Sequence, residues 1–134
     1  MKPPELDTWL TEEGDRLVRK IATTHGVDAL DARERLVYEI WLFYTEQRNG
    51  GVSQYFCNRG LEQWRTLSEI ASTALTSFVP LAEVVNQVID NSTDPYRALI
   101  KSAVNLDAYY QMHRVRLLAE LRSLLLYSNG KAIE

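Results

Sequence analysis

The chain has 134 residues, of which 46% are hydrophobic and 25% are charged, and its formal net charge is −3. A chain of this length is typical of one domain and buries roughly two-thirds of the surface that its unfolded form exposes. We therefore expect a single domain over residues 1–134. The one cysteine, Cys57, excludes an intrachain disulfide. The mild acidity disfavours direct binding to nucleic acid, which requires a basic face.

No segment has the features of a targeting or membrane-spanning sequence. The first residues are not followed by the apolar run of ~7–15 residues that a secretory signal needs. The longest nearly apolar run, 36–44, is interrupted by Glu39 and is far shorter than the ~20 residues of a membrane-spanning helix. We expect a cytoplasmic protein that does not bind a membrane.

Two helices are predicted in the first part of the chain. Apolar residues there recur on one helical face: Leu6, Leu10, Leu17 and Ile21. Gly26 is placed to end this first helix. Asp31 and Glu34 form a capping-box pattern that opens a second helix. Eight of the nine residues at 36–44 are apolar or aromatic, so we expect this helix to lie at the centre, buried nearly all round.

Glycines divide the next stretch into short pieces. The sequence Asn-Gly-Gly at 49–51 predicts the end of the central helix. One of its two glycines, Gly50 or Gly51, is expected at a positive φ, which other residues resist. A short helix over 54–58 follows, and the Arg-Gly sequence at 59–60 ends it.

The second half of the chain predicts further helices. An apolar stripe over 64–78 indicates a fourth helix, and Pro80 separates it from a fifth over 81–88. A turn cluster at 90–95 precedes a short helix, and a long last helix runs over about 107–127.

Helical periodicity therefore extends along the whole chain, and no strand pattern or internal repeat interrupts it. We predict an all-α fold, a compact single-domain bundle of about five to six helices around the buried central helix. Residues 131–134 are expected to fray.

Residues able to carry catalysis or to bind a metal are few and far apart. His25 lies in a predicted turn, and His113 has no carboxylate three or four residues away on the last helix. Glu120, seven residues on, is roughly 10 Å away along the axis. Cys57 has no second cysteine and is expected to be a small buried residue. We predict no metal site, no cofactor and no enzymatic activity.

The most distinctive segment surrounds the Asn-Gly-Gly sequence. Its structural interpretation is a helix that ends at glycine and turns sharply into an aromatic-bearing short helix, where amide side chains satisfy backbone groups left open at the turn. Its functional interpretation is a binding loop. Locally we favour the structural interpretation. The residues concerned are Asn49, Gly50, Gly51, Gln54, Tyr55, Phe56 and Asn58.

These residues resemble the signature of a bacterial helical family, the DNA mimic proteins with the DMP-nineteen-like domain. The family pattern is an Asn-Gly-Gly-aromatic turn, then Gln-Tyr/Phe-Phe and an asparagine, and Val52 stands where the aromatic is usual. The sequence Leu-Asp-Ala-Tyr-Tyr at 106–110 resembles the family's entry to its final helix. The similarity spans roughly residues 30–127. It implies an all-α fold and a protein that displays carboxylates where DNA displays phosphates, so that it occupies a DNA-binding protein.

Five acidic residues are the candidate binding positions. Residues 61–95 carry five acids against one base. Two of these acids are seven residues apart on the fourth helix and two on the fifth, so each pair shares one side of its helix. A solvated helix face without function is the plain alternative, and it stays open. The positions are Glu62, Glu69, Glu83, Asp90 and Asp94.

Three functions remain open at this stage. A DNA mimic or similar inhibitor binds a basic groove, whereas an immunity-type or adaptor protein neutralises a toxin or enzyme by its shape. A small-molecule enzyme of unknown class would need a deep polar pocket with perturbed titratable groups. The salt dependence of binding distinguishes the mimic from the adaptor, because only a charge-based contact weakens steeply as salt is added. The expected partner is therefore a protein, and a homodimer is left open.

Overall fold

The computed structural model describes residues 2–129 of the chain, with the side chains of residues 2–126. The described residues form helices and turns and contain no strand, so the predicted all-α fold is confirmed. The predicted fraying of residues 131–134 lies outside the described residues. The elements in chain order are α1 (Pro3–Thr23), η1 (Gly26–Ala29), α2 (Ala32–Ala74), η2 (Thr76–Phe78), α3 (Val79–Asp90), α4 (Pro95–Lys101) and α5 (Ala103–Asn129).

Helix α2 is bent twice and therefore consists of three segments, residues 32–49, 52–59 and 61–74. The bends fall at Gly50, Gly51 and Gly60, whose backbone is not helical. These are the two places where the glycines predict helix ends. At its start, the Asp31 carboxylate accepts a hydrogen bond from the backbone of Glu34, and the Glu34 side chain accepts one in return. The predicted capping box is confirmed.

The first segment of α2 forms the centre of the molecule, as predicted. Its Phe43 ring lies in edge-on contact with the rings of Tyr55, at 4.8 Å, and Tyr110, at 5.1 Å. Trp64 is 1% exposed and packs against Phe43 and Phe78. Aromatic pairs of this geometry contribute about 0.5–1.5 kcal/mol each beyond the area that they bury. The cluster joins all three segments of α2 to α5.

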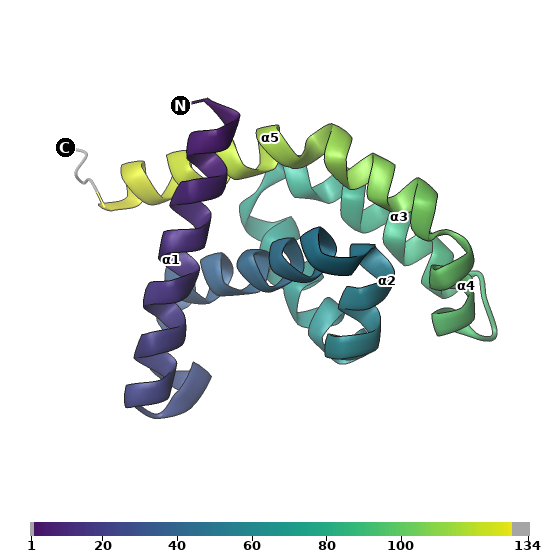
Figure 1. Cartoon of the computed structure of the whole chain (residues 1–134), viewed down its shortest axis with the longest axis horizontal. Coiled ribbons are helices and arrows are strands. Elements are labelled where there is room, and N and C mark those ends of the chain that lie inside the picture. Colours follow the sequence, from purple (N-terminus) through teal and green to yellow (C-terminus); the bar gives the residue numbers. More distant parts are fainter. Residues whose placement is uncertain (1, 130–134) are drawn as a thin grey trace.

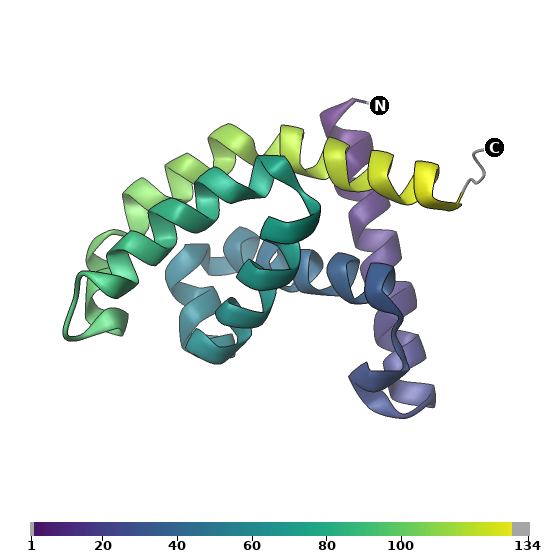
Figure 2. The same cartoon turned by 180° about the vertical axis from the view of Figure 1, so that it is seen from behind.

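The remaining helices cover this centre from three sides. Helix α1 crosses the first segment of α2, and α5 runs along one edge of the molecule beside α3 (Figures 1 and 2). A close approach fixes the first crossing, because a Cβ atom on Gly14 would lie 2.2 Å from the indole nitrogen of Trp41. Arg114 of α5 forms an ion pair with Asp7 of α1, which ties the two outer helices together.

Two details differ from the sequence-based expectations. Helix α5 begins at Ala103, not near residue 107, since the backbone hydrogen bond from Leu106 to Ser102 already has helical spacing. Cys57 is exposed instead of buried. The inward positions of its short segment are occupied by Val52, Tyr55 and Phe56, and helical spacing places the next residue on the outer side.

A carboxylate from α5 caps the start of η2, the short helix that leads into α3. Glu120 accepts hydrogen bonds from the backbone N–H groups of Thr76, at 3.0 Å, and Ser77, at 2.8 Å, and from both hydroxyls. Burial alone would raise the pKa of the Glu120 carboxyl, but these bonds hold it below its ordinary value. Backbone N–H groups without an intrahelical partner are satisfied in this way by a residue 43 positions away.

Replacing Glu120 with alanine is expected to lower the free energy of unfolding by about 1–2 kcal/mol, because two backbone donors lose their acceptor. Urea unfolding followed by circular dichroism measures the change. The control is Glu12→Ala, an exposed change on α1 that should leave the midpoint nearly unchanged. Equal midpoints for the two variants would show that the cap does not stabilise the fold.

Candidate functional site

The Asn-Gly-Gly sequence forms the first bend of α2. Gly51 has φ 83° and ψ 178°, a conformation that is essentially restricted to glycine. Gly50 has an extended φ of −158°. The expectation that one of the two glycines takes a positive φ is confirmed, and the residue is Gly51.

Asp107 of α5 holds this bend in place. Its Oδ1 atom accepts a hydrogen bond of 2.7 Å from the backbone N–H of Val52, the first residue after the bend. A Cβ atom on Gly51 would lie 2.7 Å from the other carboxylate oxygen. The two parts of the family-like pattern, at 49–58 and at 106–110, therefore meet in space. Asp107 acts as the N-terminal cap of the short second segment, although it lies 55 residues away in sequence.

The amide residues of the motif bind a carboxylate that the sequence did not single out. The Oε1 atom of Glu46 accepts hydrogen bonds from the side chains of Gln54, at 2.8 Å, and Asn58, at 2.9 Å. Its Oε2 atom accepts one from Arg59, at 2.9 Å. The expectation that Gln54 and Asn58 satisfy open backbone groups is wrong, because both amides donate to this side chain. Asn49 is exposed.

The pKa of Glu46 is set by two opposing effects. Burial alone would raise it, and the carboxylate is only 7% exposed. Three donors, one of them the charged Arg59, outweigh burial and hold the pKa below the ordinary value of 4.5. The carboxylate therefore stays ionised and keeps the second segment folded against the first.

A second buried carboxylate repeats this arrangement seven residues earlier. Glu39 is fully buried, and its oxygens accept hydrogen bonds from Arg35, at 2.8 Å, and from Gln63, at 2.7 and 2.9 Å. Gln63 belongs to the third segment of α2, so this contact closes the second bend. The available signal in the sequence was a pair of glutamates seven residues apart, on one side of a helix that is mostly apolar, because buried charges require partners.

The residues with possible chemical roles do not converge. His25 is exposed at the start of η1, Cys57 is exposed on the second segment of α2, and His113 is half-buried on α5 with its ring 4.5 Å from that of Tyr109. Across residues 2–129, no group of three or more His, Cys, Asp or Glu residues is placed to hold a metal ion. No helix of this part of the chain is both long and apolar enough to cross a membrane.

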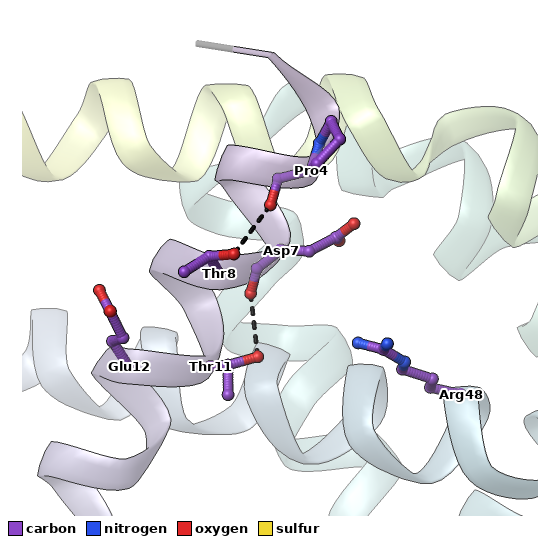
Figure 3. Close-up of a pocket in the computed structure, with 6 residues that line it drawn as sticks. All are labelled: Pro4, Asp7, Thr8, Thr11, Glu12 and Arg48. Atoms are coloured by element: carbon purple, nitrogen blue, oxygen red, sulfur yellow. Dashed lines mark hydrogen bonds between the residues drawn. The ribbon is translucent and has the colours of Figure 1, made fainter.

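Two surface hollows are lined in part by groups that already have hydrogen-bond partners. One hollow of about 330 Å³ lies where α1 meets the first segment of α2 (Figure 3). Its Thr8 and Thr11 hydroxyls donate to carbonyls of their own helix, as Figure 3 shows, and Arg48 donates to the Tyr44 hydroxyl at 2.8 Å. Another, of about 510 Å³, contains Glu120, which caps η2.

The five predicted binding residues lie at the surface, on adjacent elements. Glu62 and Glu69 are exposed on the third segment of α2, on the side opposite its buried residues, and Glu83 and Asp90 are exposed on α3. Asp94 is also exposed, but its carboxylate caps α4 by accepting from the backbone of Arg97 at 3.2 Å.

The two acidic helices are joined directly. The indole N–H of Trp64 donates to Asn86 at 2.7 Å, and Asn86 donates in turn to Ser68 at 3.4 Å. Asn86 lies about one turn from both Glu83 and Asp90 along α3. The third segment of α2 and α3 therefore form one packed pair with both acid pairs on its outer sides.

Comparison with known proteins identifies one family. The family model described as DMP19-like protein matches residues 28–127, which includes both parts of the motif and both acidic helices. No curated protein and no solved structure gives a significant match to the chain.

Gly51→Ala is expected to lower the free energy of unfolding by more than about 1 kcal/mol, because the new Cβ strains the backbone and meets the Asp107 carboxylate. Gly26→Ala is the matched control, since Gly26 also has a positive φ of 77° but has open space around it. Thermal unfolding of both variants separates strain from the contact. If Gly26→Ala is as destabilising as Gly51→Ala, the contact with Asp107 contributes nothing to the cost of Gly51→Ala.

Acid is expected to remove the stabilisation that Glu46 provides. A carboxyl whose pKa is lowered in the folded state stabilises the fold above the unfolded value, near 4.5, and loses this effect as the pH falls through the folded value. The stability gap between the wild type and Glu46→Gln should therefore shrink between about pH 6 and pH 3. Urea unfolding at each pH measures it. The gap for the exposed Glu62→Gln control should stay small throughout, and a constant gap for Glu46→Gln would contradict the assignment.

Proposed function

The chain belongs to the DMP19-like protein family, and we propose that it is a regulator that works by occupying another protein. In this proposal, surface carboxylates stand where a basic DNA-binding protein would otherwise hold DNA phosphates. The observation that carries it is the pair of joined helices with exposed acids, together with the resemblance of the chain to DNA mimic proteins. The contacts of the motif are made within the chain, to Glu46 and Asp107, and contribute the scaffold.

The acids on these two helices are available for contact. Glu62 is 94% exposed and has one loose ion pair, at 3.7 Å, with Arg65. No ion pair or side-chain hydrogen bond of Glu69, Glu83 or Asp90 occurs among the described residues. Within each pair the carboxylates are about 10 Å apart along the helix, whereas one DNA strand has a phosphate about every 3.4 Å of its axis. The acids therefore match a subset of phosphate positions, and Asp94 extends the set beyond α3.

The partner in this proposal is a protein with a basic groove, such as a DNA-binding protein, and neither nucleic acid nor a membrane is a direct ligand. Exposed carboxylates contribute little one at a time, about 0–1 kcal/mol each, but together they accelerate encounter with an oppositely charged surface. A homodimer would present two such acidic helix pairs.

A second candidate function is that of an immunity-type or adaptor protein, which blocks a toxin or enzyme by shape. The exposed apolar residues on α4 and α5, among them Val104 at 81% and Met112 at 75%, favour it, because apolar contacts give affinity that salt does not weaken.

The acidic helix pair is tested by changing Glu62, Glu69, Glu83 and Asp90 together to their amides. The partner is first isolated from the cells of origin on the tagged full chain and identified, and its association is then measured at several salt concentrations. The variant should associate on the order of tenfold more slowly, with a shallower salt dependence. Circular dichroism verifies that the fold is intact.

The matched control removes the same charge elsewhere, from the acids on α1 and η1 that are exposed: Glu5, Glu12, Asp15 and Asp28. Its association rate should stay closer to that of the wild type. If both quadruple variants slow association equally, only net charge matters and the proposed surface is wrong. If neither changes the rate or the salt slope, the adaptor function replaces the mimic function.

A further inference from the structure

The outer face of α5 is apolar along most of its length. Among the described residues, six of the seven large apolar side chains that are exposed belong to α4 and α5. On α5, apolar exposed residues recur every three or four positions, which places them on one side of the helix. We call this row the α5 stripe: Val104, Ala108, Met112, Val115 and Ala119.

The stripe begins directly after α4 and faces away from the core. Ile100, which is 57% exposed, lies on α4, whose last backbone hydrogen bond runs from Ser102 to Ala98, and α5 begins with the bond from Leu106 to Ser102. The buried side of α5 carries Leu106, Tyr110 and its other core residues. In both views of the molecule, α5 runs along the edge away from α2, and the start of α1 crosses it and extends past that edge (Figures 1 and 2). From residue 104 to 119 the stripe is about 22 Å long.

Exposed basic residues lie beside the stripe on α5 and on the preceding helix α4, and the acids of α5 are already engaged. Arg97, Lys101 and Arg116 are exposed, and no ion pair of theirs occurs among the described residues. Between residues 95 and 126 there are only two acids. Asp107 caps the second segment of α2, and Glu120 caps η2. The charged side chains that remain free for a partner beside the stripe are therefore basic.

We propose that the α5 stripe is a docking surface for an amphipathic helix of a partner protein whose apolar face is bordered by carboxylates. A straight row at helical spacing matches the apolar row of a second helix. Ala108 and Ala119 lie on either side of the larger Met112 and Val115, which leaves room for the side chains of that helix. The basic residues select acidic neighbours and disfavour a second copy of this chain, because the acids of α5, Asp107 and Glu120, are already engaged.

This surface is distinct from the acidic helix pair. The residues that carry it, on α4 and α5, are not among those proposed to replace phosphates, and its partner chemistry is of opposite charge. The inference therefore stands whether or not the proposed mimicry is correct.

The experiment places a photo-crosslinking amino acid at position 112 of the full chain, expressed in the cells of origin, and maps the crosslinked peptides by mass spectrometry. We expect crosslinks to a helical segment of a different protein with Asp or Glu beside its apolar face. A crosslinker at Val18, which is exposed to 41% on α1, is the matched control and should not capture that segment.

A double variant, Val104→Glu with Met112→Glu, tests the affinity for a synthetic peptide of the captured segment. Both positions are largely exposed, so the fold should persist, and binding should weaken at least tenfold, while Val18→Glu binds as the wild type does. Crosslinks from position 112 only to this same chain, only to lipid, or only to segments without acidic borders would overturn the proposal. Unchanged peptide affinity in the double variant would overturn it as well.

Discussion

The structure depends on a buried carboxylate in the last turn of the first α2 segment, that of Glu46. Taking the Glu46 side chain out of water costs several kcal/mol unless hydrogen bonds replace the lost hydration. Gln54, Asn58 and Arg59 supply them, and these donors reach the carboxylate only when the chain turns back after Gly51. The charge therefore specifies where the helix bends, while burial of Tyr55 and Phe56 supplies the driving force.

The bend in turn determines where the other helices lie. Because the second segment of α2 starts at Val52, its first backbone N–H group faces α5 and is capped by Asp107. This places Tyr110 against Phe43 in the core and leaves the α5 stripe on the outside. Gln63 then closes onto Glu39, which sets the third segment beside α3 through Trp64 and Asn86. The acidic helix pair and the α5 stripe are both consequences of one internal network.

Helix caps and backbone conformations that depend on neighbouring residues could be predicted from the sequence. Hydrogen-bond partners far apart in the chain could not. The capping box at Asp31 and the positive φ at Gly51 follow from residue types a few positions apart. Val52 and Asp107 are 55 residues apart, and no local pattern connects them. For the same reason, the sequence predicts a start of α5 near residue 107, four residues too late. Asp107 has the residue type of a helix cap, but it caps another segment. Cys57 was expected to be buried from its type alone, yet its position in the short segment decides its exposure.

Membership of the family and the choice of partner rest on different residues. The motif residues Gly51, Gln54 and Asn58 are engaged with Asp107 and Glu46, so they are constrained by folding. Glu62, Glu69, Glu83 and Asp90 are exposed on helices whose inner faces already hold them in place. A change of charge at these positions alters the surface and leaves the internal network intact, because no donor of that network reaches them. The fold therefore supports either an acidic or a neutral face on these two helices. In the proposed function, the number and spacing of the carboxylates on that face decide which basic partner the chain occupies.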